Sequence, residues 1–111
     1  MQVKLKTKGE TLVVQMLGEL DHHVAGTLRA EIDAKLSGDK VKNIVFNFHG
    51  VEFMDSSGLG MVLGRYKAAS EKGGKVLACS LSPAVRRVFE LAGLPSRIPV
   101  FGTEQEALDN V

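Results

Sequence analysis

Residues 43–48, NIVFNF, form a short and nearly continuous apolar run that leads into a helical pattern from about Ser57 to Lys72. The run is rich in β-branched and aromatic residues, which is typical of an interior strand covered on both faces. A buried strand followed directly by a helix indicates an α/β protein. The chain has 111 residues, of which 44% are hydrophobic, so we expect a single domain over residues 1–111 with a substantial core.

The segments before this run extend the same alternation. VKLK and TLVVQML, separated by the turn-like KGE, predict an antiparallel strand pair. DHHVAGTLRAEIDAKLSG then predicts a helix, with Asp21 as its N-cap and Gly38 as its stop. Ala25, Leu28, Ile32 and Leu36 would share its buried face.

The segments after it predict a strand, a helix, an edge strand and a short last helix. KVLAC reads as a buried strand, and SPAVRRVFELAG as a helix capped by Ser82 with Pro83 at its first position. RIPVF can only be an edge strand, because Pro99 has no N–H to donate. Thr103 and Glu106 have capping-box spacing. The predicted order is ββαβαβαβα, an α/β domain with a mixed sheet of about five strands and about four helices.

Composition narrows the classes of partner. Fourteen basic and thirteen acidic residues leave no strong field of either sign, which argues against nucleic acid and anionic membrane as partners. The single cysteine, Cys79, rules out an internal disulfide, and its apolar surroundings predict a buried, inert thiol. The N-terminus has no signal-peptide pattern and no segment reaches membrane-spanning length, so we expect a soluble cytoplasmic protein.

The helix after Ser57 is unusually rich in glycine. A helical projection places one set of residues toward the sheet: Leu59, Val62, Leu63, Tyr66 and Ser70. It places Met61, Gly64 and Ala68 on the opposite side, with Gly60 on the flank. Each interior glycine costs roughly 1 kcal/mol relative to alanine. Close approach to the sheet could explain Gly60, but not Gly64. A smooth apolar outer strip is better explained by docking of another protein.

Two adjacent serines stand where the strand ends and this helix begins. Serine is a frequent N-cap, so either Ser56 or Ser57 could cap the helix. Only one cap is needed, and the other serine is left without a structural role. A hydroxyl at a helix N-terminus lies beside free backbone N–H groups and the positive end of the macrodipole. A phosphoryl group is tolerated there. The junction therefore favours serine phosphorylation, without choosing between the two serines.

Rival kinds of site fail on their motifs. The residues two before the serines are Met54 and Asp55, so the G-x-S-x-G elbow of a serine hydrolase is absent. The available bases would be His22 and His23, at another strand-to-helix junction, and His49 before a predicted turn at Gly50. Gly58, Gly60 and Gly64 give one residue too many for a dinucleotide fingerprint, and no Gly-Lys-Ser/Thr occurs. The chain also lacks the acidic pair and the lysine that a phosphorylated Asp55 would need in a response-regulator receiver, and no Cys/His cluster supports a metal.

Three segments carry a family resemblance that spans essentially the whole chain. GELDHH at 18–23, FMDSSGLGMVLGRYK at 53–67 and SPAVRRVFELAGL at 82–94 resemble the STAS domain, in particular the anti-sigma factor antagonists of spore-forming bacteria. The resemblance implies that Ser57 is phosphorylated by a partner that is both anti-sigma factor and serine kinase, and that a phosphatase reverses this. It implies that the unphosphorylated form binds the kinase in its ADP-bound state and thereby frees the sigma factor. It also implies a place for Asp21 on the partner-facing rim.

We therefore expect a non-enzymatic protein-interaction switch, with Ser57 as phosphorylation site and no catalytic residue, cofactor or metal. The expected partner-binding residues are Asp21, Asp55, Ser56, Gly58, Leu59, Gly60, Met61 and Gly64. The expected partners are the anti-sigma factor/serine kinase and a serine phosphatase, with the sigma factor affected only indirectly. Two alternatives stay open: a nucleotide-binding or weak NTPase domain that uses the Gly-rich helix start, and a STAS scaffold of another stress-response cascade.

Overall fold

A computed structural model describes all residues, 1–111, and contains one five-stranded sheet with the order β1-β2-β3-β4-β5. The strands are β1 (Gln2–Lys8), β2 (Thr11–Leu20), β3 (Asn43–Met54), β4 (Val76–Cys79) and β5 (Val100–Phe101). β1 and β2 pair in antiparallel fashion, and the remaining three pairings are parallel. The mixed sheet and the order ββαβαβαβα are therefore confirmed, and the strands lie in the sheet in the order in which they occur along the chain.

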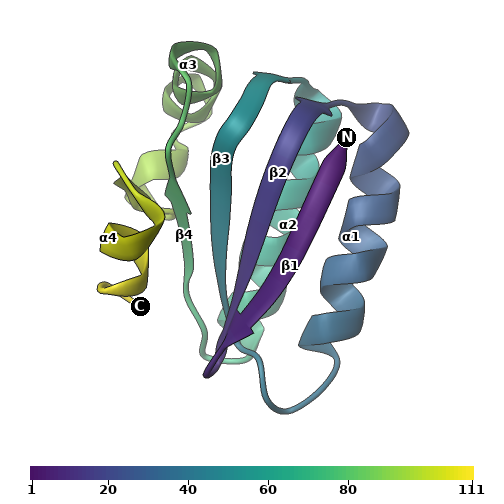
Figure 1. Cartoon of the computed structure of the whole chain (residues 1–111), viewed down its shortest axis with the longest axis vertical. Helices are drawn as coiled ribbons and strands as arrows, with labels where there is room; N and C mark the ends of the chain where they lie inside the picture. The colour runs from purple at the N-terminus through teal and green to yellow at the C-terminus, as the bar shows by residue number, and fades with distance from the viewer.

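Four α-helices and one 3₁₀ turn connect and cover these strands. They are α1 (His22–Leu36), α2 (Ser56–Glu71), α3 (Pro83–Leu91), the 3₁₀ turn η1 (Leu94–Ser96) and α4 (Glu104–Leu108). α1 and α2 lie side by side behind the sheet, whereas α4 lies on its other face (Figure 1). Asp21, Ser82 and Thr103 cap their helices, as the sequence predicted. No helix combines the length and the apolar character needed to cross a membrane.

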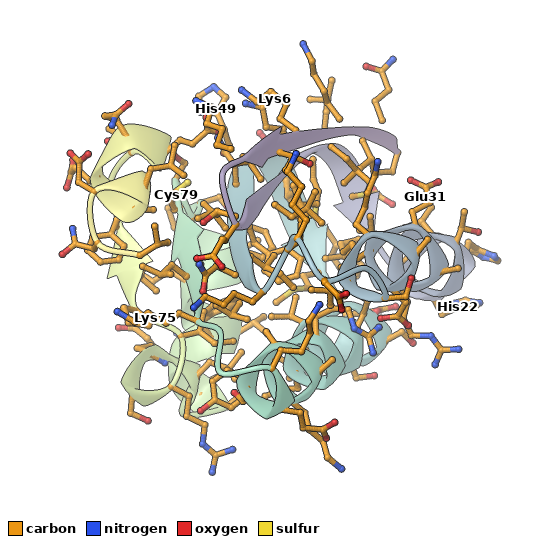
Figure 2. All side chains as sticks on the ribbon, turned by 90° about the horizontal axis from the view of Figure 1, so that it is seen from below. Lys6, His22, Glu31, His49, Lys75 and Cys79 are labelled. Atoms are coloured by element: carbon orange, nitrogen blue, oxygen red, sulfur yellow. The ribbon has the colours of Figure 1, made fainter.

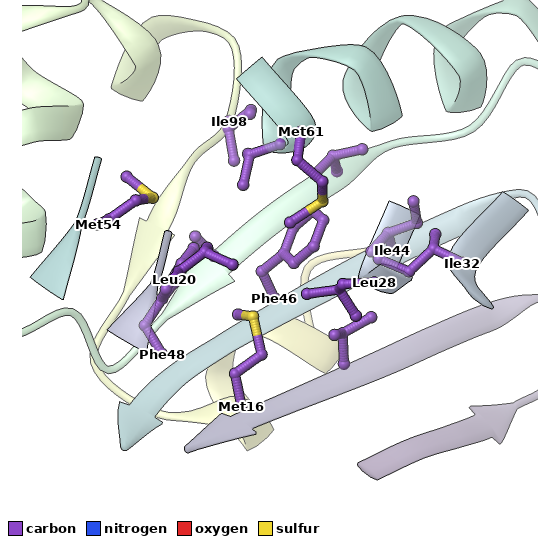
Figure 3. Close-up of a cluster of buried hydrophobic side chains, with 14 of the residues drawn as sticks. Met16, Leu20, Leu28, Ile32, Ile44, Phe46, Phe48, Met54, Met61 and Ile98 are labelled. Carbon is purple, nitrogen blue, oxygen red and sulfur yellow. The ribbon is translucent and has the colours of Figure 1, made fainter. Parts of the chain in front are cut away.

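The main core lies between the sheet and helices α1, α2 and α3. The side chains of Phe46 and Phe48 from β3 are fully buried there, and the ring of Phe89 from α3 meets Phe48 edge-to-face at 5.5 Å. Figure 3 shows this cluster, with side chains of β2, α1 and α2 around the phenylalanines. Burial of large apolar side chains such as these stabilises the fold.

A smaller core lies on the opposite face of the sheet, under α4. It consists of Val13, Val45, Leu77, Cys79 and Ala107. Cys79 lies between the sheet and α4 (Figure 2), and burial raises the pKa of its thiol to about 11. The prediction of a buried cysteine is confirmed, and the raised pKa favours its thiol form at neutral pH.

β3 is twice as long as the predicted run, and it carries two irregularities of pairing with β2. The register shifts between Gln15 and Leu17, and again between Gly18 and Glu19. His49 and Gly50 consequently lie inside the strand, and the expected turn at Gly50 is wrong. A side chain at Gly50 would meet Leu17 Cα at 2.9 Å, so this glycine permits close contact between the two strands.

Candidate functional site

The site is built where two parallel strands end next to each other. Leu20 of β2 pairs with Met54 of β3, and each strand is followed at once by an aspartate that starts a helix. The backbone N–H of Asp55 donates to the carbonyl of Leu20 at 3.2 Å, which joins the two junctions. Because parallel strands present their carboxyl ends at the same edge, the N-termini of α1 and α2 lie at one end of the sheet.

Asp55 caps α2, so the prediction that one of the serines is the cap is wrong. Its Oδ1 accepts hydrogen bonds from the N–H groups of Ser57, at 2.9 Å, and Gly58, at 3.1 Å. A carboxylate in this position satisfies two orphan donors and complements the helix dipole, which makes it at least as good a cap as a hydroxyl. Asp21 caps α1 with a single hydrogen bond, accepting from His23 N–H at 2.9 Å.

Both serine hydroxyls are consequently spared from capping. Ser56 is exposed and Ser57 is half-buried, and neither hydroxyl forms a hydrogen bond within the chain. They are the first two residues of α2. The expectation of free backbone N–H groups beside Ser57 needs correction, because the Asp55 carboxylate already occupies two of them. A phosphoryl group on Ser57 would lie beside that carboxylate, which offsets part of the benefit from the helix dipole.

The glycine that brings α2 close to the sheet is Gly58. A Cβ there would lie 2.6 Å from the Leu20 carbonyl oxygen and 2.8 Å from Met54 Cγ, so any side chain would force the helix away. At Gly60 and Gly64 an added Cβ would meet nothing within 4 Å. Close packing therefore does not explain Gly60. Both outer glycines border open space, as the sequence predicted for Gly64.

The buried face of α2 is rotated from the predicted one. The fully or nearly buried positions are Gly58, Met61, Val62, Arg65 and Ala69, while Ser70 is exposed. Met61, expected on the outer strip, is only 4% exposed and lies among the core side chains (Figure 3). The reason is α1, which packs against α2 from the side, so α2 buries a face shared between the sheet and α1. Leu59, Leu63, Tyr66 and Ala68 are partly buried at the margins of this face.

What remains of the predicted strip is an open groove between α1 and α2. Gly26, Arg29 and Gly60 are exposed along it, Ser57 and Gly64 are half-buried, and Ala25, Met61 and Arg65 are buried at its base. Its volume is about 380 Å³. We call this the α1/α2 groove. Ser57 lies at one end of it, so a modification there changes the groove directly.

Arg65 is a buried charge that the sequence reasoning did not single out. Arg65 is only 9% exposed, and its Nε lies 3.1 Å from the Oδ1 of Asp33 in α1. The Nε–H does not point at that oxygen, so Nε and Nη1 have no hydrogen-bond acceptor. Buried charges need compensation by a partner, and here it is incomplete. Arg65 is the arginine of the GRYK stretch, but a helical projection assigns arginine to the solvent-facing side, so the sequence alone does not predict its burial.

The remaining candidates stay apart from this site. His22 and His23 are exposed at the start of α1 with ring centroids 4.0 Å apart, and His49 projects from the sheet face opposite α1 and α2 (Figure 2). No group of three or more His, Cys, Asp or Glu side chains is arranged to hold a metal ion. The arrangement offers a hydroxyl for modification and a shaped surface for contact.

Comparison with known proteins agrees with this architecture. The STAS domain family matches residues 2–107. The anti-sigma F factor antagonist of Lysinibacillus sphaericus is 39% identical over 99% of this chain and 92% of its own length, and that of Paenibacillus polymyxa is 36% identical over 97% and 92%. The anti-sigma-B factor antagonist of Staphylococcus aureus is 30% identical over 96% of this chain and 98% of its own.

Solved structures of the anti-sigma factor antagonist SpoIIAA, stage II sporulation protein AA, match nearly the whole chain. Its unphosphorylated form is 38% identical with a TM-score of 0.88, over 98% of this chain and 95% of that chain. Its phosphorylated form, described as a Bacillus cell fate determinant, is 37% identical with a TM-score of 0.82, over 98% of both chains. The sequence match across residues 2–107 and the shared fold show that this chain belongs to the STAS domain family.

Proposed function

We propose that this chain is an anti-sigma factor antagonist that acts as a non-enzymatic switch. Its unphosphorylated form binds an anti-sigma factor that is also a serine kinase, in the ADP-bound state, and so frees a sporulation sigma factor. Phosphorylation of Ser57 inactivates it, and a serine phosphatase restores it. The observation that carries the proposal is the Ser57 hydroxyl, left unused by helix capping and lining the open α1/α2 groove. The 36–39% identity to anti-sigma F factor antagonists supports the same function.

The switch works by excluding charge from a contact surface. Phosphorylation adds about −1.5 to −2 charges at Ser57, next to the Asp55 carboxylate. While the surface is free, water solvates this charge. In a closed interface the charge must be desolvated, which costs several kcal/mol and is offset only in part by a single guanidinium such as that of Arg29 in the same groove. A loss of about 3 kcal/mol would weaken binding more than a hundredfold.

The surface that docks consists of the exposed residues around Ser57. Ser56 and Gly60 are exposed, and Asp21, Asp55 and Leu59 are half-buried at the same helix starts, as is Gly64 farther along α2. Gly58 and Met61 are buried below this surface and cannot contact a partner directly; they set the position of α2. We assign them a positioning role in the proposed interface.

The proposal is tested by incubating the chain with the cognate kinase and ATP and mapping the phosphate by tandem mass spectrometry. We expect modification of Ser57 and none of Ser56. Ser57→Ala is expected to bind the kinase and resist inactivation, whereas Ser57→Asp binds about a hundredfold more weakly. Ser56→Ala is the matched control and should behave as wild type. A Ser57→Asp variant with wild-type affinity would remove charge exclusion as the mechanism.

A second candidate is the same switch in a stress-response cascade with a different kinase. The 30% identity to the anti-sigma-B factor antagonist of Staphylococcus aureus favours it. Co-purification distinguishes the two, because the chain should retain the kinase of one cascade and not that of the other.

A further inference from the structure

We propose that the α1/α2 groove recognises an acidic side chain of the anti-sigma factor partner through Arg29. This inference rests on the proposed function and adds the chemistry of the contact. It starts from an imbalance of charge. Two arginines line the groove, Arg29 and Arg65, and no acidic residue lines it. Two carboxylates border it: that of Asp33, 3.1 Å from the Nε of Arg65, and that of Asp55, which accepts from the backbone N–H groups of Ser57 and Gly58 at the start of α2.

Arg65 leaves part of its charge uncompensated at the base of the groove. Its Nε and Nη1 are buried without hydrogen-bond acceptors, and Asp33, whose side chain is 46% exposed, is its one ion-pair partner. A half-exposed carboxylate is partly screened by water and neutralises a buried guanidinium incompletely. The lining of the groove, with Arg29 and Arg65 and no acidic residue, therefore favours an anionic group.

Arg29 is positioned to make the direct contact. It is exposed on α1, lines the groove and forms no ion pair within the chain. Long side chains on a helix lean toward its N-terminus, which here is the end of the groove that carries Ser57. A guanidinium with free donors suits bidentate binding of a carboxylate.

The groove also has room for an incoming side chain. No side chain projects from Gly60 or Gly64, and an added Cβ at either meets nothing within 4 Å. An aspartate or glutamate on a partner element laid across α2 could enter over these glycines and reach Arg29. The two arginines of the groove and its open glycines together select an acidic rather than a basic or apolar side chain.

This contact explains why a small modification has a large effect. Ser57 lines the same groove as Arg29. A phosphate there would repel the incoming carboxylate and compete with it for the guanidinium. Like charges brought together at an interface cost several kcal/mol, in addition to the desolvation of the phosphate itself.

The test measures the affinity of the unphosphorylated chain for its anti-sigma factor in the presence of ADP. Arg29→Glu is expected to weaken binding at least about tenfold, and Arg29→Ala less. Arg87→Glu, an equal charge change on the exposed side of α3, is the control and should change affinity by less than about twofold. Replacing acidic surface residues of the partner by lysine, one at a time, should identify one that restores binding to Arg29→Glu.

The outcomes separate this inference from the proposed function. If the wild-type chain does not bind the anti-sigma factor, the proposed function fails. If wild type binds, Ser57→Asp does not, and Arg29→Glu binds as wild type, the function stands and the acidic contact is overturned. Equal weakening by Arg29→Glu and Arg87→Glu, or no restoring lysine, also overturns it. Circular dichroism melting of Arg29→Glu should match wild type, because Arg29 contributes no contact to the core.

Discussion

Asp55 and Gly58 set the geometry of the serine pair, although neither carries the proposed modification. Asp55 holds the first turn of α2 through two backbone N–H groups and thereby releases both serine hydroxyls. Gly58 lets that turn approach the Leu20 carbonyl oxygen. The functional display of Ser57 therefore depends on its neighbours on both sides in the sequence.

Removal of the cap is predicted to cost stability while removal of the neighbouring hydroxyl does not. Asp55→Ala should lower the free energy of unfolding by about 1 kcal/mol, because the N–H groups of Ser57 and Gly58 lose their acceptor. Ser56→Ala, the control, should stay within about 0.5 kcal/mol of wild type. Urea denaturation measures both. If Ser56→Ala lowers the free energy of unfolding more than Asp55→Ala does, then Ser56 rather than Asp55 is the N-cap.

Two glycines of α2 are predicted to respond in opposite directions to the same substitution. Gly58→Ala should destabilise the fold by about 1–3 kcal/mol, since its Cβ would lie 2.6 Å from a carbonyl oxygen. Gly64→Ala should stabilise it by about 0.5–1 kcal/mol, because it raises helix propensity and meets no neighbour. Thermal melting of the two variants, compared with wild type, gives the signs directly. If Gly64→Ala lowers the melting temperature, the conclusion that a Cβ at Gly64 meets no neighbouring atom is wrong.

Among the elements, α4 is attached to the sheet by the small apolar core around Ala107 and by one carboxylate that contacts three strands. Glu104 accepts hydrogen bonds from Gln15 at 2.8 Å and Asn47 at 3.1 Å, and pairs with Lys6 at 3.5 Å. These donors come from β2, β3 and β1. Burial on its own would raise the pKa of Glu104, yet the two amide donors and the charge of Lys6 lower it overall. A helix of five residues is too short to be stable alone, so α4 depends on these polar contacts together with the burial of Ala107.

The lowered pKa of Glu104 predicts an acid-dependent loss of stability. The pKa of Glu104 is lower in the folded chain than in the unfolded chain, so the ionised carboxylate stabilises the fold at neutral pH. This stabilisation is lost as the pH falls below 4.5 and through the folded pKa. Glu104→Gln should be less stable than wild type by about 1–2 kcal/mol at pH 7 and approach it in acid. Glu90→Gln, exposed on α3, is the control, and urea denaturation from pH 3 to 7 is the measurement. Parallel pH curves for Glu104→Gln and wild type would contradict this assignment.

The sequence predicted the elements well and their contacts less well. Apolar runs and caps such as Ser82 and Thr103 are local signals, so the order of strands and helices could be read directly. The orientation of α2 depends on α1, which is distant in sequence, so a helical projection of α2 alone predicts Met61 on the outer side. The length of β3 beyond Phe48 was missed because its register shifts against β2 interrupt the alternation of side chains.

At the scale of the whole molecule, the site occupies one end of a rigid sheet. α1 and α2 start together at that end and run along the same face (Figure 1), so the groove between them is fixed by two helices rather than by a loop. A docking surface built on regular elements keeps its shape before and after modification.

Phosphorylation is therefore predicted to leave the fold of this chain unchanged. Crystal structures of the two forms should superpose closely along α2, and their amide NMR spectra should differ only near Ser57. The reason is that Ser57 makes no side-chain hydrogen bond that modification would break. A rearranged α2 in the phosphorylated chain would show that the switch acts through conformation.

The strand order β1-β2-β3-β4-β5 has a consequence for synthesis on the ribosome. Each new strand finds its neighbour already made, and no connection has to wait for a distant part of the chain. By the time Cys79 emerges from the exit tunnel, four of the five strands and both walls of the groove are available to assemble. A nascent chain stalled soon after that point should already protect its first strands from protease.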